Sequence, residues 1–279
     1  MVTPVAELLE EWGLTPDGPP LPARRASVLP VVGERGPAVL KVGVVHPVGE
    51  VEGRAAHEAL ALQRWGGHGA VRLLRADPHR RALLLERLAG PDAADPAAGL
   101  WDAAAGELVG AHLADLHVDP LPQVPRLAAY VAEQGRALAA LPRDAPLPRR
   151  LVEQALALGR DLVADPGDER LLHGDLHPAH LVAAGPEAPD QWRAVSPKPL
   201  AGDPHSEVAP LLWHQWDDVV GDVRGSLRRR FLAVVDAALL DEDRARDWVV
   251  LRTVHRALAA LDDRDRVTRC IAVVKAVQE

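Results

Sequence analysis

The chain has 279 residues, of which 48% are hydrophobic and 26% are charged, and its formal net charge is -8. This length and composition are typical of a globular protein with one large or two modest domains around an apolar core. The negative charge argues against a nucleic-acid partner, and the single cysteine, Cys270, excludes an internal disulfide and a thiolate metal cluster. We see no signal peptide and no apolar run of the roughly 20 residues that span a bilayer, so we expect a cytoplasmic protein without a membrane partner.

The first part of the chain is predicted to be rich in β-structure. A short amphipathic helix is expected over residues 5–14. Two valine-rich runs within 26–45, separated by a Gly-Glu-Arg-Gly turn, predict a pair of strands. A helical pattern over 50–65 follows, and residues 69–88 predict a second strand–turn–strand unit.

The character of the sequence changes after residue 90, where helical patterns dominate. These patterns cover residues 100–118, 124–140, 148–164, 206–217, 223–240, 244–261 and 266–277. Short apolar runs at 171–172, 181–183 and 192–195 predict a small β-structure with polar residues on its turns. We therefore predict an α+β fold with a small β-rich N-lobe, 1–90, and a larger, mainly helical C-lobe, 91–279. Two unequal lobes imply a cleft, which is where ligand sites tend to lie.

The stretch "LLHGDLHPAHLV", residues 171–182, concentrates the polar chemistry. One interpretation is a metal site, because His173, His177 and His180 are spaced to share one face of a helix. Gly174 and Pro178 argue against a continuous helix there. A histidine-ligated metal hydrolase centred on residues 173–180 nevertheless stays open as a hypothesis of function. A second interpretation is structural, since loop histidines and aspartates often cap turns, and this fits His177 best.

The third interpretation is a phosphotransfer loop, in which Asp175 orients an acceptor hydroxyl and takes its proton. Such a loop requires a strand lysine for nucleotide phosphates and a helix glutamate that fixes this lysine. Lys41 ends the run "AVLK" on the second expected strand and is the only lysine before Lys198. Glu58 follows in the next expected helix and can reach back to it. Taken together, these residues favour an ion pair over two solvated surface groups.

The same residues resemble a known family. "HGDLHPAH" resembles the loop "HGDLHxxN" of aminoglycoside phosphotransferases and related small-molecule kinases. "AVLKV", "HEALALQRWGGHGAVRLL", "LLLERL", "PKPLAGDPHSEVAPLL" and "CIAVVKAV" are similar, in the same order, to the branch with the streptomycin 6-phosphotransferases and hydroxyurea-type antibiotic-resistance kinases. The resemblance covers the chain from about residue 26 to its end. It implies a bilobal protein-kinase-like fold, ATP and Mg²⁺ as cofactors, and a small hydroxylated acceptor such as a cationic aminoglycoside.

The resemblance also implies roles for individual residues. Lys41 would hold the α- and β-phosphates of ATP, and Glu58 would anchor Lys41. The backbone from Glu86 to Leu88 would be the hinge that bonds the adenine. Asp175 would be the catalytic base, and His173 would order the loop around it.

Two positions depart from the family pattern. The metal-binding asparagine of the family falls at His180, and its metal-binding aspartate falls at Ser196 in "AVSPKP". Mg²⁺ prefers hard oxygen ligands, so neither residue suits it, and His180 would favour Mn²⁺ or Zn²⁺. Asp203 or Glu207 could move in as a metal ligand or contact the acceptor, while a turn aspartate and a first-turn helix carboxylate are the structural alternatives.

Two function classes therefore compete. The first is an ATP-dependent O-phosphotransferase of a small hydroxylated molecule, which the ordered motifs favour. Acidic residues along 203–222 and 262–265 would attract a cationic acceptor, or would simply form a solvated acidic face. The second is an impaired or inactive, pseudokinase-like binding or regulatory protein, which the paired replacements at His180 and Ser196 favour.

Overall fold

The computed structural model describes residues 4–23, 26–43, 57–88, 103–185, 188–214, 216 and 221–278. The chain divides into two compact units. The first comprises Met1–Pro96 with His180–Lys198, and the second comprises Ala97–Ala179 with Pro199–Glu279. Residues 89–102, where the lobe boundary was predicted, lie outside the described part, so that boundary stays a prediction. The segment 180–198, which the sequence placed in the larger lobe, groups with the first unit.

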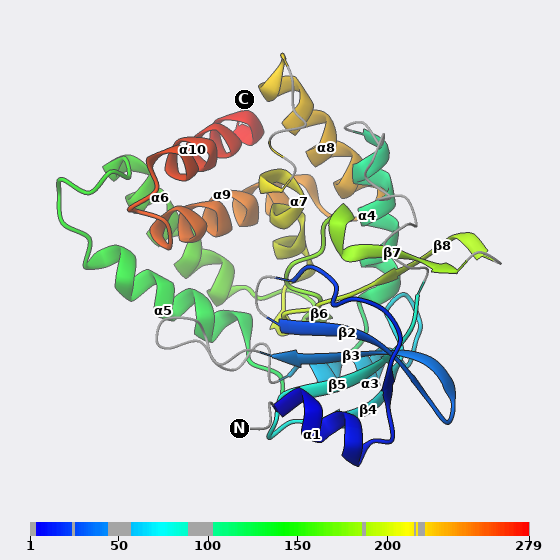
Figure 1. Cartoon of the computed structure of the whole chain (residues 1–279). Helices are drawn as coiled ribbons and strands as arrows, with labels where there is room; N and C mark the ends of the chain where they lie inside the picture. The colour runs from blue at the N-terminus through cyan, green and yellow to red at the C-terminus, as the bar shows by residue number, and fades with distance from the viewer. Residues whose placement is uncertain are drawn as a thin grey trace. The chain divides into compact units, whose positions relative to one another are not determined.

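A five-stranded antiparallel sheet forms the frame of the first unit (Figure 1). Its strands, in the spatial order β1-β2-β3-β5-β4, are β1 (Thr15–Pro16), β2 (Ala26–Gly33), β3 (Gly36–Gly43), β5 (Ala82–Glu86) and β4 (Leu73–Asp77). The helices α1 (Pro4–Glu11) and α3 (Glu58–Trp65) accompany the sheet. Both predicted strand pairs are confirmed, and so is the C-terminal part of the predicted helix over 50–65; its residues 50–56 lie outside the described part.

Alternation along β3 decides which side chains enter the core of this unit. Ala38, Leu40 and Val42 are buried in a cluster with Leu8 of α1. Successive residues of a strand point to opposite faces of the sheet. The side chain of Lys41 therefore points to the face of the sheet opposite this core. Its partner there is Glu58, the first residue of α3.

A second hairpin, β7 (Leu181–Gly185) and β8 (Ala188–Ala194), also belongs to the first unit. The amide of Ala194 donates to the carbonyl of Gly69, and its own carbonyl accepts from Val71. The hairpin is thus fastened to the segment that leads into β4. Both strands match apolar runs predicted from the sequence.

The second unit is mainly helical (Figure 1). Its helices are α4 (Ala103–Leu116), α5 (Leu127–Ala139), α6 (Arg149–Ala164), α7 (Ala209–Trp213), α8 (Val223–Ala237), α9 (Glu242–Leu258) and α10 (Arg264–Gln278). The helix α9 packs against α6 and α10 and is buried along most of its length. No helix in the described ranges has the length and apolar character needed to cross a membrane.

A short ladder positions the loop that the sequence singled out. The strand β6 (Arg170–Leu172) pairs antiparallel with β9 (Leu200–Gly202). The loop from His173 to His177 leaves the end of β6, and the 3-10 helix η2 (Pro204–Val208) begins just after β9. A Cβ on Gly202 would lie 2.5 Å from the Cβ of Leu127, so only glycine allows α5 to approach here.

Candidate active site

The loop that carries Asp175 is held by a fully buried carboxylate. Glu207 of η2 accepts from the amide of His173 at 2.9 Å and from the amide of Gly174 at 2.5 Å. Its Oε2 atom also lies 3.2 Å from Nε2 of His117 on the chain after α4. Burial alone would raise the pKa of Glu207, but the hydrogen bond to His117, electrostatic attraction to His117 and His173, and the amide of Gly174 prevail and lower its pKa.

The backbone of the loop is fixed from its other side as well. Gly174 has φ +81°, a left-handed conformation that favours glycine. Its carbonyl accepts from Nη2 of Arg252 on α9 at 3.1 Å, while Nη1 of the same arginine donates to Ser206 at 3.0 Å. The amide of Asp175 donates to Nδ1 of His173 at 3.3 Å, an arrangement that suits the loop-ordering role predicted for His173. The backbone around Asp175 is thus rigidly defined, which a catalytic base requires.

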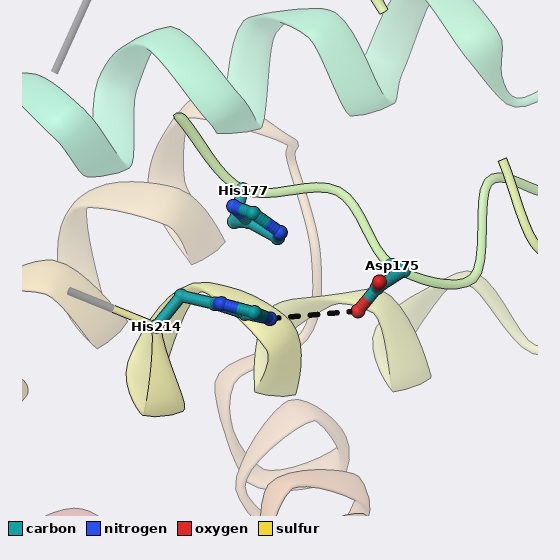
Figure 2. A group of neighbouring side chains, drawn as sticks. All are labelled: Asp175, His177 and His214. Atoms are coloured by element: carbon teal, nitrogen blue, oxygen red, sulfur yellow. Dashed lines mark ion pairs between the residues drawn. The ribbon is translucent and has the colours of Figure 1, made fainter. Parts of the chain in front are cut away.

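The carboxylate of Asp175 lies beside two stacked imidazoles. The rings of His177 and His214 are 3.5 Å apart and nearly parallel, at 18°. Nε2 of His214 is 3.6 Å from Oδ1 of Asp175, as Figure 2 shows. His214 follows directly after α7 and was not anticipated from the sequence. It lies beside Asp175 because η2 and α7 lead the chain back to the loop. No local sequence pattern predicts that path.

The three loop histidines divide between the two compact units. The structure groups His177 with Asp175 and His214, whose possible ligand atoms lie within 4.8 Å of one another. His173 instead uses its Nδ1 atom on the amide of Asp175, and His180 belongs to the other compact unit. The metal-hydrolase hypothesis on the three loop histidines therefore stays a prediction.

The ion pair expected of Lys41 and Glu58 is present in the first unit. Nζ of Lys41 lies 2.7 Å and 2.9 Å from the two carboxylate oxygens of Glu58. Their side chains are only 16% and 6% exposed, respectively. This contact holds the ammonium group in one place, which is what a phosphate-binding lysine needs.

The two positions that replace the family's metal ligands also lie in the first unit. Nζ of Lys41 donates to Oγ of Ser196 at 3.3 Å, so the hydroxyl faces a cation. The amide of Val195 donates to the carbonyl of His180 at 2.9 Å. An imidazole and a neutral hydroxyl beside an ammonium do not fit Mg²⁺, which prefers anionic oxygen ligands. These residues therefore do not form the usual magnesium site.

The predicted hinge has mostly internal contacts. Glu86 accepts from the amide of Arg72 at 2.8 Å. Arg87, the middle residue of the predicted hinge, is engaged by the sheet rather than free in solvent. Its guanidinium donates to the carbonyl of Val31 at 2.7 Å and to Asp17 at 2.6 Å, which ties the hinge to the sheet. The role of the Glu86–Leu88 backbone in binding adenine stays a prediction.

Asp203, offered from the sequence as a metal or acceptor ligand, is committed to the fold instead. It accepts from Nε1 of Trp248 and from Nε of Arg244, both at 2.6 Å, and it caps η2 through the amide of His205. Burial would raise the pKa of Asp203, but the hydrogen bonds from His205 and Trp248 prevail and lower it. Both carboxylate oxygens of Glu207 likewise accept hydrogen bonds, from the amides of His173 and Gly174. The structure thus supports the turn and helix alternatives for both carboxylates rather than a contact with acceptor or metal.

Comparison with known proteins agrees with this arrangement. The model of the aminoglycoside/hydroxyurea antibiotic resistance kinase family matches residues 11–264. A streptomycin 6-kinase of Streptomyces glaucescens is 40% identical over 269 residues, which cover 93% of this chain and 82% of that protein. A hydroxyurea phosphotransferase of Kitasatospora aureofaciens is 39% identical over 268 residues, covering 93% and 73%.

Solved structures show the fold. A choline/ethanolamine kinase family protein from Mesorhizobium loti superposes with a TM-score of 0.64 at 14% identity, covering 99% of each chain. The predicted α+β, protein-kinase-like fold is thereby confirmed. The match of the family model, the two relatives and this shared fold lead to one conclusion: the chain belongs to the aminoglycoside/hydroxyurea antibiotic resistance kinase family.

Proposed function

We propose that this chain is an ATP-dependent phosphotransferase that modifies a hydroxyl group of a small molecule. The observation that supports this most is the loop of Asp175, whose backbone is fixed by Glu207 and Arg252. A buried carboxylate that fixes two successive amides costs desolvation, which suits a loop whose geometry must be accurate. The paired Lys41 and Glu58 supply the second element that a phosphotransferase needs.

Each residue has a distinct role in this proposal. ATP supplies the phosphoryl group. Asp175 orients the acceptor hydroxyl and accepts its proton as the oxygen attacks. Lys41 holds phosphate oxygens through its fixed positive charge, and Glu58 keeps that charge in place. His173 positions Asp175 through the hydrogen bond from the amide of Asp175.

The relatives bear on the acceptor and on the competing function. Their names specify streptomycin and hydroxyurea, so acceptors differ within the family. We propose a small hydroxylated acceptor, with aminoglycosides as the first class to test. The pseudokinase alternative gains no support, because the matched relatives are named as kinases or phosphotransferases. A location in the cytoplasm, where ATP is available, is part of the proposal.

The test is phosphotransfer from γ-labelled ATP to streptomycin, hydroxyurea and a panel of other hydroxylated antibiotics. Each reaction is run with Mg²⁺ and with Mn²⁺, because His180 and Ser196 do not form the usual magnesium site. We expect label in at least one acceptor, and we expect Asp175→Asn to abolish it. If no acceptor is labelled with either metal above the level of Asp175→Asn, the proposed function is wrong.

A further inference from the structure

Ser196 adopts a backbone conformation that serine rarely takes. Its φ is +58°, in the left-handed region where the Cβ of an L-residue is crowded. Pro197 follows it, and a residue before proline favours extended backbone. Such conformations persist where the surrounding structure imposes them, and they are concentrated at functional sites. The strain at Ser196 therefore calls for an explanation in what its side chain contacts.

The chain on both sides of Ser196 is anchored within the first unit. Ala194 ends β8 and is held in the hairpin described above. The amide of Val195 donates to the carbonyl of His180 at 2.9 Å. On the other side, Pro197 is buried. Because its neighbours are fixed, Ser196 keeps the left-handed backbone, and its Cα–Cβ bond has a defined direction.

The side chain of Ser196 reaches the ammonium group of Lys41. Its Oγ atom accepts from Nζ of Lys41 at 3.3 Å, and Nζ also donates to the two oxygens of Glu58 at 2.7 Å and 2.9 Å. An ammonium group has three N–H donors, and these acceptors match that number. A hydroxyl that accepts on one side directs its own hydrogen elsewhere. The O–H of Ser196 is thus a donor that a fixed cation polarises from behind.

The charges of these three side chains suit a phosphate contact at the hydroxyl. Lys41 and Glu58 carry opposite charges and are only 16% and 6% exposed, while Ser196 is neutral. Both oxygens of Glu58 are committed to Lys41, so Ser196 is the member of the three that turns a polar hydrogen outward. A carboxylate in place of this hydroxyl would make the set negative and favour a divalent cation. The hydroxyl instead keeps the set neutral and adds a donor, which a phosphate oxygen accepts.

We propose that Ser196 donates a hydrogen bond to a phosphate oxygen of the nucleotide, so that this residue contacts the polyphosphate directly instead of through a metal ion. Lys41 attracts the phosphate by its charge, and Ser196 supplies the directed contact. The inference rests on the proposed function, in which ATP supplies the phosphoryl group. Its consequence is that nucleotide affinity depends less on divalent cations than it would with aspartate at this position, where the family pattern has one.

The first test removes the donor and measures binding by titration calorimetry. ADP and inorganic tripolyphosphate are the probes, adenosine is the phosphate-free control, and each is titrated with Mg²⁺ and with EDTA. Ser196→Ala should weaken binding of both probes about tenfold, the effect of losing one hydrogen bond to a charged group, and should leave adenosine binding unchanged. Ser226→Ala is the matched control, because the hydroxyl of Ser226 on α8 also accepts from a cationic side chain, that of Arg229, at 3.1 Å. Its affinities should equal those of the native protein.

The second test reverses the charge preference. In EDTA, Ser196→Asp should weaken ADP binding on the order of a hundredfold, because a carboxylate beside Lys41 repels the phosphates. Mg²⁺ should restore most of this loss, since the cation bridges the new carboxylate and the phosphate oxygens. The ratio of the affinities with Mg²⁺ and with EDTA should therefore be far larger for Ser196→Asp than for the native protein. Equal ratios for the two proteins would overturn the proposal.

A third variant separates the hydroxyl from the strained backbone. Ser196→Gly also lacks the donor but relieves the left-handed conformation, so its unfolding midpoint should lie above that of Ser196→Ala. Both variants should lose the same phosphate affinity. Native affinity for tripolyphosphate in either folded variant would contradict the assignment, as would the absence of ADP and tripolyphosphate binding to the native protein.

These measurements need neither an acceptor nor turnover, so they separate the two proposals. A native protein that shows the predicted binding pattern but labels no acceptor leaves the role of Ser196 in place and overturns the proposed function. A native protein that transfers phosphate but binds ADP no better than Ser196→Ala does keeps the proposed function and overturns the role of Ser196.

Discussion

Replacing Glu207 with glutamine should destabilise the protein strongly, although the two side chains have nearly the same shape. The carboxylate receives the amides of His173 and Gly174 on its two oxygens, and His117 on one of them. Glutamine offers one oxygen and one NH₂ group, so at least one backbone N–H must face another donor. A buried donor without an acceptor costs about 1–3 kcal/mol, and the lost charge-assisted hydrogen bonds add about 1.5–3 kcal/mol.

The sum, about 2.5–6 kcal/mol, translates into a measurable shift of the unfolding midpoint. At roughly 2–4 °C per kcal/mol for a chain of this size, the unfolding midpoint should fall on the order of 10 °C. Scanning calorimetry at pH 7 measures it. Glu153→Gln is the matched control, because Glu153 is 64% exposed and pairs with Arg149 on the same helix. The shift of its unfolding midpoint should stay within about 1–2 °C.

The pH dependence provides an independent check of the same reasoning. The pKa of Glu207 is lowered in the folded protein relative to its ordinary value of 4.5. Its contribution is therefore complete above the unfolded-state pKa and is lost as the pH falls through the folded-state pKa. The difference between native protein and Glu207→Gln should shrink in acid. A midpoint shift at pH 7 no larger than that of Glu153→Gln would refute the role assigned to this carboxylate.

Three further predictions concern other parts of the molecule. Leu239 is 90% exposed with φ +54° at the end of α8, so Leu239→Gly should stabilise the protein by roughly 0.5–1 kcal/mol in urea titrations; a destabilisation would show that the left-handed turn carries no strain. Burial raises the pKa of the Cys270 thiol to about 11, so a thiol-specific disulfide reagent at pH 8 should react only upon unfolding, and an immediate stoichiometric reaction would disprove this. Lys41→Met removes the countercharge of Glu58 and should lower the phosphotransfer rate on the order of a hundredfold, whereas an unchanged rate would exclude Lys41 from catalysis.

Long periodic elements were predictable from the sequence because their patterns are local. The helices of the second unit and the strand pairs of the first follow from hydrophobic periodicity and turn residues. The strand β9 was missed, since its three residues, Leu200–Gly202, are too few to show a period. The contact between Lys41 and Glu58 could be expected because a strand and the next helix place them within reach.

The remainder of the site depends on distant segments and could not be inferred from local patterns. His214 meets Asp175, and Arg252 meets Gly174, only through the packing of α7 and α9 around the loop. The same limit applies to Asp203 and Glu207. Their acidity suggested ligand binding, while their actual donors, such as Trp248 and the amide of Gly174, come from elsewhere in the chain.

The central claim is that Asp175 activates an acceptor hydroxyl for phosphotransfer from ATP. The most direct measurement is the initial rate of phosphorylated product formation, followed by mass spectrometry of the acceptor, for native protein and Asp175→Asn side by side. The account predicts a product that gains one phosphoryl group with native protein and a rate at least about a hundredfold lower with the folded variant. Equal rates for the two proteins would contradict it.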